Sequence, residues 1–344
     1  MIFNVLDNEI IIKQIITLLQ NHPTLSPSLI HRIRKMFPQL SQEEIKILLD
    51  IGIGTIHASQ SHKFSDTFSN WLFTKQTYEQ STSEQIAHHH ALRFSCVKSI
   101  LEICTGAGID TNIFSRNNKS VTTIESNMLI ADLACRNFKQ NNLNTITLIR
   151  GKAEDILIDR FDYTKFDGVW ADPSRRNITG KRISISEKDY LPNLNWIMSL
   201  PVARIMGIKV SSALNIDNLP SGWVREWIGL NNECKEQILW KNSDICEGTV
   251  SIIDKHTSWF PQNKRIKPLD IVTSLNLAFY LVEPHPSLIR CGYLAEFYDE
   301  YSIGLFDYRI GYGITESKPP ISSLYSVFEI IEQFDFNYKH LQSR

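Results

Sequence analysis

The chain has 344 residues, of which 42% are hydrophobic and 21% are charged, and its formal net charge at pH 7 is -1. This composition is that of a globular protein with two or three domains, and it excludes a largely disordered chain and a general electrostatic attraction to nucleic acid or membrane. Any contact with nucleic acid must therefore come from a local patch of basic residues.

The six cysteines lie far apart, with no Cys-x-x-Cys pair and no histidine at ligand spacing. This spacing argues against a disulfide framework or a zinc site, so we expect no metal and predict that the thiols are small buried hydrophobes. The first seven residues lack the basic region of a signal peptide, and no apolar run approaches the ~18 residues of a membrane span. The sequence therefore predicts a cytoplasmic protein without membrane contact.

Three helices are predicted near the N-terminus. Apolar residues recur at helical spacing over residues 8–20, Ser26 followed by proline is typical of a helix start, and Ser41 with Glu44 forms a capping-box pattern. We assign residues 1–85 to an N-terminal helical module.

A polar turn followed by a helix is predicted over residues 71–94. Ser81, Thr82 or Ser83 could cap this helix at its start. The three consecutive histidines at 88–90 would point in three directions on a helix. At most one of them can therefore face a pocket, and a metal shared by all three is not expected.

The most informative stretch is a strand, turn, helix and second strand between residues 98 and 125. Its first part is apolar, and the break at Thr-Gly-Ala-Gly needs a backbone that can turn and approach a ligand closely. After a helical pattern, a β-branched segment ends in an acid. Because ligands bind beyond the carboxyl ends of the strands of an open α/β sheet, Gly106, Gly108 and Glu125 are expected to edge one crevice.

Glu125 is placed to accept hydrogen bonds from both hydroxyls of a ribose. For the Gly-x-Gly pattern alone, the alternative is that Gly108 only lets a helix pack closely and that Glu125 is a solvated acid. Two features differ from a dinucleotide site: Thr111 stands where a third glycine would be, and Asp110 places negative charge where a pyrophosphate would lie. An acid there suits a cationic ligand, such as the sulfonium and amino group of S-adenosylmethionine.

Three segments resemble the Rossmann-like, class I S-adenosylmethionine-dependent methyltransferases: Glu102-Ile-Cys-Thr-Gly-Ala-Gly-Ile-Asp-Thr111, Ile124-Glu-Ser-Asn127 and Ala171-Asp-Pro-Ser-Arg-Arg176. The resemblance is closest to the bacterial group whose members carry a C-terminal THUMP-like domain, and more distant to trimethylguanosine synthases. It implies an α/β fold, a three-layer methyltransferase sandwich with an N-terminal helical module and a small C-terminal α+β unit. It also implies S-adenosyl-L-methionine as the cofactor and RNA as the partner.

The resemblance places the cofactor along the ends of the first three strands. Many such enzymes have an aspartate after the glycine that ends the third strand, where it accepts the adenine amino group, but Lys152 stands there in this chain. We therefore move this role to Glu154 or Asp155. Thr82 is added because a similar segment lines the cofactor pocket of trimethylguanosine synthases, with helix capping as the alternative. The predicted cofactor-binding residues are Thr82, Glu102, Cys104, Gly106, Gly108, Asp110, Thr111, Glu125, Ser126, Asn127, Ala153, Glu154 and Asp155.

A fourth strand, over residues 166–171, ends in Asp172-Pro173. In the doubly wound order this strand neighbours the first one across the switch point, so Asp172 is expected to face the cofactor. The turn resembles the family motif that presents a substrate to the methyl group, whereas by itself it would be an ordinary turn after a strand. The predicted catalytic residues are Asp172, Pro173 and Arg175.

The loop that follows carries four cations, Arg175, Arg176, Lys181 and Arg182. Guanidinium groups suit bidentate contacts with phosphate, so these four residues are the predicted nucleic-acid contacts. Solvated loop charge is the competing interpretation.

After a helix over residues 191–200 and a fifth strand over 203–210, three further strands are predicted before Asp254, some of them antiparallel. Beyond a linker, a helical stretch over 286–299, a segment over 303–310 and a last helix through Phe328 are expected. The predicted domains are the helical module, a methyltransferase domain over 86–256, a linker with a small α+β unit over 257–333, and the start of a truncated THUMP-like domain over 334–344.

The preferred function is methyl transfer from S-adenosylmethionine to a nitrogen of an RNA base. Transfer to C5 of a base is disfavoured because it needs a thiolate nucleophile and no cysteine adjoins Asp172. One alternative is a nicotinamide-dependent oxidoreductase, which would explain the glycine turn but neither Asp110 nor Asp172. Another is a nucleic-acid-binding protein that retains the fold without activity, to which Lys152 gives some weight.

Overall fold

The computed structural model describes residues 6–22, 24–116, 119–159, 162, 165–175, 187–201, 204–216, 219–262, 279–307 and 309–332. By internal contacts the chain divides into two compact units. The first is Met1–Val210 with Trp240–Ser243, and the second is Ser211–Leu239 with Asp244–Arg344. This division does not decide the predicted domain boundaries, which stay predictions.

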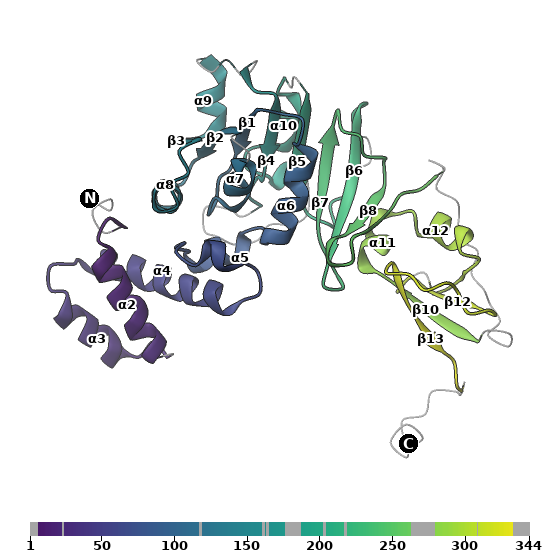
Figure 1. Cartoon of the computed structure of the whole chain (residues 1–344), viewed down its shortest axis with the longest axis horizontal. Helices are drawn as coiled ribbons and strands as arrows, with labels where there is room; N and C mark the ends of the chain where they lie inside the picture. Colours follow the sequence, from purple (N-terminus) through teal and green to yellow (C-terminus); the bar gives the residue numbers. More distant parts are fainter. Residues whose placement is uncertain are drawn as a thin grey trace. The chain divides into compact units, whose positions relative to one another are not determined.

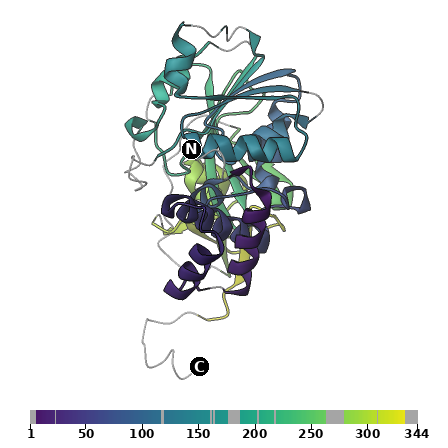
Figure 2. The same ribbon diagram turned by 90° about the vertical axis from the view of Figure 1, so that its left-hand side faces the viewer.

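The three predicted N-terminal helices are confirmed, and they pack side by side around a shared apolar core (Figure 2). They are α2 (Glu9–Asn21), α3 (Pro27–Met36) and α4 (Gln42–Gln60). The predicted caps also form: the Ser26 hydroxyl accepts from the backbone N–H of Leu29, and Ser41 and Glu44 make a reciprocal capping box. Local polar residues therefore define where these helices begin.

Five parallel strands form the sheet of the first unit, in the order β3-β2-β1-β4-β5 (Figure 1). Their bounds are Ser99–Ile103 (β1), Ser120–Glu125 (β2), Ile146–Arg150 (β3), Gly168–Ala171 (β4) and Ile205–Val210 (β5). The order reverses between β1 and β4, where Ile103 is in register with Ala171. The carboxyl ends of β1, β2 and β4 therefore meet at the switch point where open α/β sheets bind ligands.

Helices connect these strands, and α8 packs against β2 and β3 while α6 contacts α7 (Figure 1). Beneath α6 and α7, the buried ring of Trp170 contacts the rings of Phe94 and Phe114. This aromatic cluster packs beside β4, the strand that contains Trp170. The helices are α5 (Lys75–Gln80), α6 (Glu84–Arg93), α7 (Ile109–Phe114), α8 (Met128–Gln140), α9 (Ala153–Asp159) and α10 (Leu194–Ser199), with 3-10 turns at Asp66–Phe68 and Glu187–Asp189.

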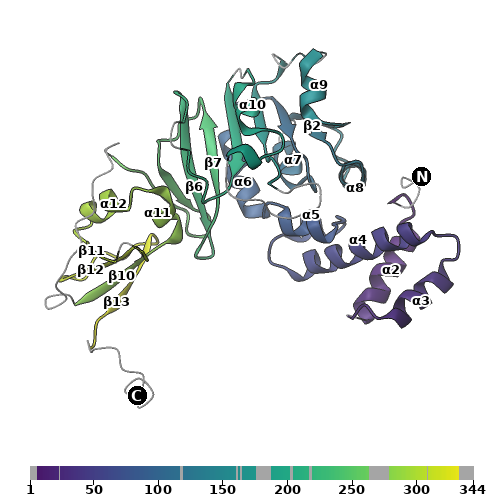
Figure 3. The ribbon, with the colours of Figure 1, turned by 180° about the vertical axis from the view of Figure 1, so that it is seen from behind.

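The second unit contains strands in the order β7-β6-β8-β9 and a separate antiparallel sheet in the order β11-β12-β10-β13 (Figure 3). β6 pairs in parallel with β8, and β8 pairs antiparallel with β9. Helix α11 contacts β6 and β8. The bounds are Trp223–Leu230 (β6), Glu233–Lys241 (β7), Thr249–Ile252 (β8), Thr257–Trp259 (β9), Tyr280–Pro284 (β10), Gly304–Asp307 (β11), Tyr312–Thr315 (β12), Tyr325–Glu329 (β13), Pro286–Cys291 (α11) and Leu294–Glu300 (α12), with a 3-10 turn at Ile253–Lys255.

The predicted last helix through Phe328 is wrong, because these residues form β13. All five residues of β13 pair with β10, which lies more than 40 residues earlier in the chain and has no counterpart in the local sequence pattern. The predicted helical stretch over 286–299 is two helices, α11 and α12. Helix α11 ends where Gly292 adopts a left-handed conformation with φ of 82°.

The prediction that the cysteines are buried is also wrong for most of them. Cys291 is buried, but Cys96 and Cys246 are exposed and the other three are half-buried. Cys135 lies in α8 and Cys234 in β7, while Cys96, Cys104 and Cys246 lie in turns or loops. The spacing of the six cysteines in the sequence gave no indication of their exposure. No described helix is both long and apolar enough to span a membrane.

Candidate functional site

The glycine turn after β1 uses left-handed backbone at three positions, with φ of 71° at Cys104, 55° at Gly106 and 86° at Gly108. A Cβ at Gly108 would lie 2.5 Å from a ring carbon of Phe138, so this glycine is required for packing as well as for its conformation. A Cβ at Gly106 would have no other heavy atom within 4 Å. The open space at this turn is therefore at Gly106, whereas Gly108 fits the packing alternative.

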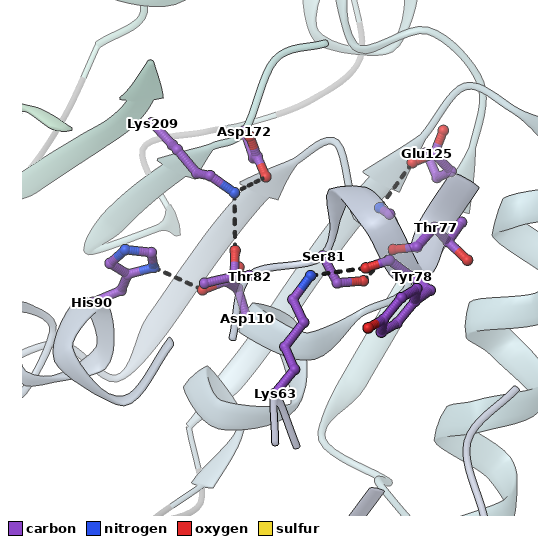
Figure 4. A network of polar contacts seen from close by, with 11 residues as sticks. Lys63, Thr77, Tyr78, Ser81, Thr82, His90, Asp110, Glu125, Asp172 and Lys209 are labelled. Atoms are coloured by element: carbon purple, nitrogen blue, oxygen red, sulfur yellow. Dashed lines mark hydrogen bonds and ion pairs between the residues drawn. The ribbon is translucent and has the colours of Figure 1, made fainter. Parts of the chain in front are cut away.

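Glu125 is the last residue of β2, and its side chain accepts a hydrogen bond from this turn (Figure 4). Its Oε2 accepts from the backbone N–H of Gly106 at 3.0 Å, and its Oε1 accepts from the backbone N–H of Asn127 at 2.8 Å. Burial raises the pKa of this carboxyl, and these backbone donors oppose the rise. Because a carboxylate accepts about four hydrogen bonds, Glu125 can still accept from the two hydroxyls of a ribose.

Glu102 and Thr111 bond to each other rather than facing open space. The Thr111 hydroxyl donates to Glu102 Oε2. Both residues are buried: Thr111 is 0% exposed and Glu102 is 1% exposed. Burial raises the pKa of Glu102 to about 8. The pair ties the first turn of α7 to β1, beneath the surface on which a ligand would lie.

Asp110 is paired with a histidine that the sequence did not indicate as its partner (Figure 4). Its Oδ1 lies 2.8 Å from Nδ1 of His90, whose buried ring lies against Trp170 with ring centroids 4.4 Å apart. Burial alone would raise the pKa of Asp110, but the charge and hydrogen bond of His90 and the charge of Lys209 outweigh it, so the pKa is lowered. Of the three consecutive histidines, His90 is the one that enters the site.

Lys209, near the end of β5, joins Asp172 to Thr82 (Figure 4). Its Nζ lies 2.8 Å from Asp172 Oδ2 and 3.0 Å from the hydroxyl of Thr82. Thr82 is 5% exposed and does not cap α6, since Ser83 stands at the N-cap and makes no side-chain capping bond. The capping alternative is therefore wrong, and Thr82 belongs to the polar network at the switch point.

The Asp172-Pro173 turn is held by backbone hydrogen bonds on both sides. The N–H of Asp172 donates to the carbonyl of Ile103 in β1, and Ser174 and Leu191 form an isolated antiparallel bridge. The side chain of Asp172 is about one-third exposed, while Pro173 is buried. Arg175 is half-buried, and the other predicted nucleic-acid contacts, Arg176, Lys181 and Arg182, lie outside the described residues.

The remaining predicted cofactor contacts line the ends of β2 and β3. Asn127 caps α8, its Oδ1 accepting from the backbone N–H of Ile130, while Ser126 beside it is exposed. At the start of α9, Ala153 is buried, Glu154 is half-buried, and Asp155 and Lys152 are exposed. The adenine contact of Glu154 or Asp155 stays a prediction. No group of three or more metal-ligating side chains occurs among the residues that the structure describes.

The fold defined by this sheet and its switch point matches that of a solved structure described as a methyltransferase. Among solved structures, a candidate methyltransferase from Porphyromonas gingivalis W83 matches with a TM-score of 0.71 and 16% identity, over 97% of this chain and 85% of that one.

Two further structures match more weakly. The O-methyltransferase TomG from Streptomyces achromogenes, in complex with SAM, has a TM-score of 0.36 and 16% identity, over 59% of this chain and 98% of that one. An O-methyltransferase from Bacillus cereus, in complex with SAH, has a TM-score of 0.35 and 14% identity, over 61% and 96%. No family model and no curated protein matches the sequence.

Proposed function

We propose that the protein is an S-adenosylmethionine-dependent methyltransferase that acts on a nitrogen of an RNA base. The observation that carries the proposal is Glu125, a buried carboxylate bonded to the N–H of Gly106 beside the open side of the glycine turn. A ribose fits this arrangement, because two neighbouring hydroxyls can donate to one carboxylate.

Around the ribose, the residues present also fit the rest of this cofactor. The carboxylate of Asp110, kept ionised by His90 and Lys209, suits a cationic amino group. Glu154 or Asp155 would accept from the adenine amino group. S-adenosylmethionine, when bound, supplies a methyl group already activated by its sulfonium, so the protein mainly has to position the acceptor.

Asp172 is the residue we propose for positioning the acceptor nitrogen. A carboxylate can accept from a substrate N–H while its other hydrogen bond holds Lys209, which fixes its direction. The carbonyl groups of the Asp172-Pro173 turn can accept a second N–H, so that the nitrogen lone pair points at the methyl carbon. No covalent intermediate is needed.

Cys104 gives no support to the competing C5 chemistry. Burial and the nearby carboxylates of Glu125 and Asp172 raise the pKa of this thiol well above its usual value. A thiolate is therefore disfavoured at the one cysteine of the glycine turn. The RNA substrate itself rests on the family resemblance and on the cations that begin at Arg175.

The experiment that tests this function compares the modified nucleosides of total RNA, by mass spectrometry, in cells with and without the gene. Loss of one methylated nucleoside that purified protein restores in the presence of S-adenosylmethionine is the expected result. If no nucleoside changes and the purified protein transfers no methyl group to bulk RNA, the RNA assignment is wrong. Calorimetric titration with NAD, compared with S-adenosylmethionine, tests the oxidoreductase alternative.

A further inference from the structure

A cavity of about 660 Å³ lies within the second unit, and none of the residues that line it is assigned a role above. It is formed by the turn after β5, by β6, by α11 and by the residues before β12. Its volume is within the range of about 300–1,000 Å³ that small-molecule sites occupy. Its lining residues include Asn215, Arg225, Trp227, Ile289, Arg290 and Arg309.

The lining is positively charged. It contains three arginines, and the described residues that line it include no aspartate or glutamate. Two of the arginines have carboxylate partners that do not line the cavity: Arg225 pairs with Glu247 at 2.5 Å, and Arg309 pairs with Asp307 at 2.7 Å. Arg290, which is exposed on α11, has no carboxylate partner among the residues that the structure describes. The cavity therefore retains about one uncompensated positive charge, which suits a single anionic group.

The guanidinium of Arg225 is held in place rather than free to turn. Its backbone N–H and its Nε donate to the two oxygens of Glu247, at 2.7 and 2.6 Å, and its Cζ lies 5.4 Å from the centroid of the Trp227 ring. A donor that is already ordered loses little entropy when it binds an anion. The arrangement thus offers one fixed guanidinium and one adaptable guanidinium to the same ligand.

Another part of the lining is apolar and suits a flat ring. Ile289 is 39% exposed, which is high for a large aliphatic side chain, and it lies on the same short helix as Arg290. Pro286 and the edge of Tyr293 continue this wall. Gly292 leaves open space, since a Cβ there would have no heavy atom within 4 Å.

We infer that this cavity binds a nucleoside monophosphate unit, with the phosphate on Arg290 and Arg225 and the base against Ile289 and Pro286. The unit can be a free nucleotide or the phosphorylated end of an RNA strand, since both present the same phosphate and base. A free inorganic anion would leave the apolar wall exposed, and a hydrocarbon chain would leave the arginines unused. The inference does not rest on the proposed methyl transfer, because none of these residues belongs to the switch-point site.

The test is calorimetric titration of the full chain with AMP and UMP, compared with adenosine and with inorganic phosphate. The nucleotides are expected to bind at least tenfold more tightly than adenosine alone or inorganic phosphate alone. The exposed Arg290→Gln should weaken this binding by roughly tenfold or more, because one charged hydrogen bond is lost. Arg32→Gln, which removes an exposed arginine of α3, is the matched control and should leave it unchanged.

Two short RNAs of one sequence, with a 5′-phosphate and with a 5′-hydroxyl, separate the two sources of the ligand. Tighter binding of the phosphorylated RNA than of AMP points to a strand end, and equal binding points to a free nucleotide. The inference is overturned if neither nucleotide binds at millimolar concentration, if inorganic phosphate binds as well as AMP, or if Arg290→Gln binds like the parent while circular dichroism shows it folded.

Discussion

Glu102 makes the stability of the first unit depend on pH in a way that one substitution should remove. Its side chain is 1% exposed, and burial raises its pKa from 4.5 to about 8. Between these two pH values the folded protein holds a proton that the unfolded chain has lost, so stability falls as pH rises through this window. The stabilisation is complete below pH 4.5 and is lost by about pH 8.

The size of this loss follows from the same two values. Each tenfold change in the proton equilibrium corresponds to about 1.4 kcal/mol, so the parent protein should lose up to about 5 kcal/mol of unfolding free energy across the window because of Glu102 alone. Glu102→Gln does not ionise, and its amide oxygen can still accept from the hydroxyl of Thr111. The free energy of unfolding of the variant, relative to that of the parent, should therefore increase as pH rises.

Denaturation by urea at pH 5 and at pH 8 measures this difference for both proteins, with all other titrating groups in common. We expect the free energy of unfolding of Glu102→Gln, relative to the parent, to increase by several kcal/mol between the two pH values. A difference that is the same at both pH values would refute the reasoning. Carbon-13 NMR of the side-chain carboxyl would then show Glu102 titrating near 4.5.

Two further predictions concern the glycine turn and the switch point. Gly108→Ala should lower stability by about 2–4 kcal/mol, because it combines a clash with Phe138 and a left-handed backbone. Gly106→Ala has only the left-handed backbone and should cost about 1–2 kcal/mol. Thermal unfolding measures both losses, and equal losses would show that Gly108 has no packing role. Asp172→Ala should abolish methyl transfer but retain S-adenosylmethionine binding, and Lys209→Met should lower kcat. Full activity of Asp172→Ala in a radiolabelled methyl-transfer assay would remove it from the catalytic site.

Much of the first unit could be predicted because its signals are local. The capping hydroxyl of Ser26 accepts from the backbone N–H of Leu29, only three residues later. The strand, glycine turn and strand from β1 to β2 occupy fewer than 30 consecutive residues. The position of Glu125 beside Gly106 follows from the rule that ligands bind at the carboxyl ends of parallel strands.

The parts that could not be predicted depend on contacts between distant residues. Lys209 and Thr82 are separated by 127 positions, and nothing in the spacing of either indicates that their side chains meet. In the sequence, His90 cannot be distinguished from the two histidines before it. It is the packing of α6 on α7 that brings His90 to Asp110. In the same way, β13 is a strand only because β10 pairs with it, which a local helical pattern cannot reveal.

The measurement that tests the central claim most directly is calorimetric titration of the protein and of Glu125→Ala with S-adenosylmethionine. The account predicts that the parent binds one molecule and that the variant binds it at least tenfold more weakly, because charged hydrogen bonds worth about 1.5–3 kcal/mol are lost. NAD should not compete. Absence of S-adenosylmethionine binding to the folded parent, or equal affinity in Glu125→Ala, would contradict the account.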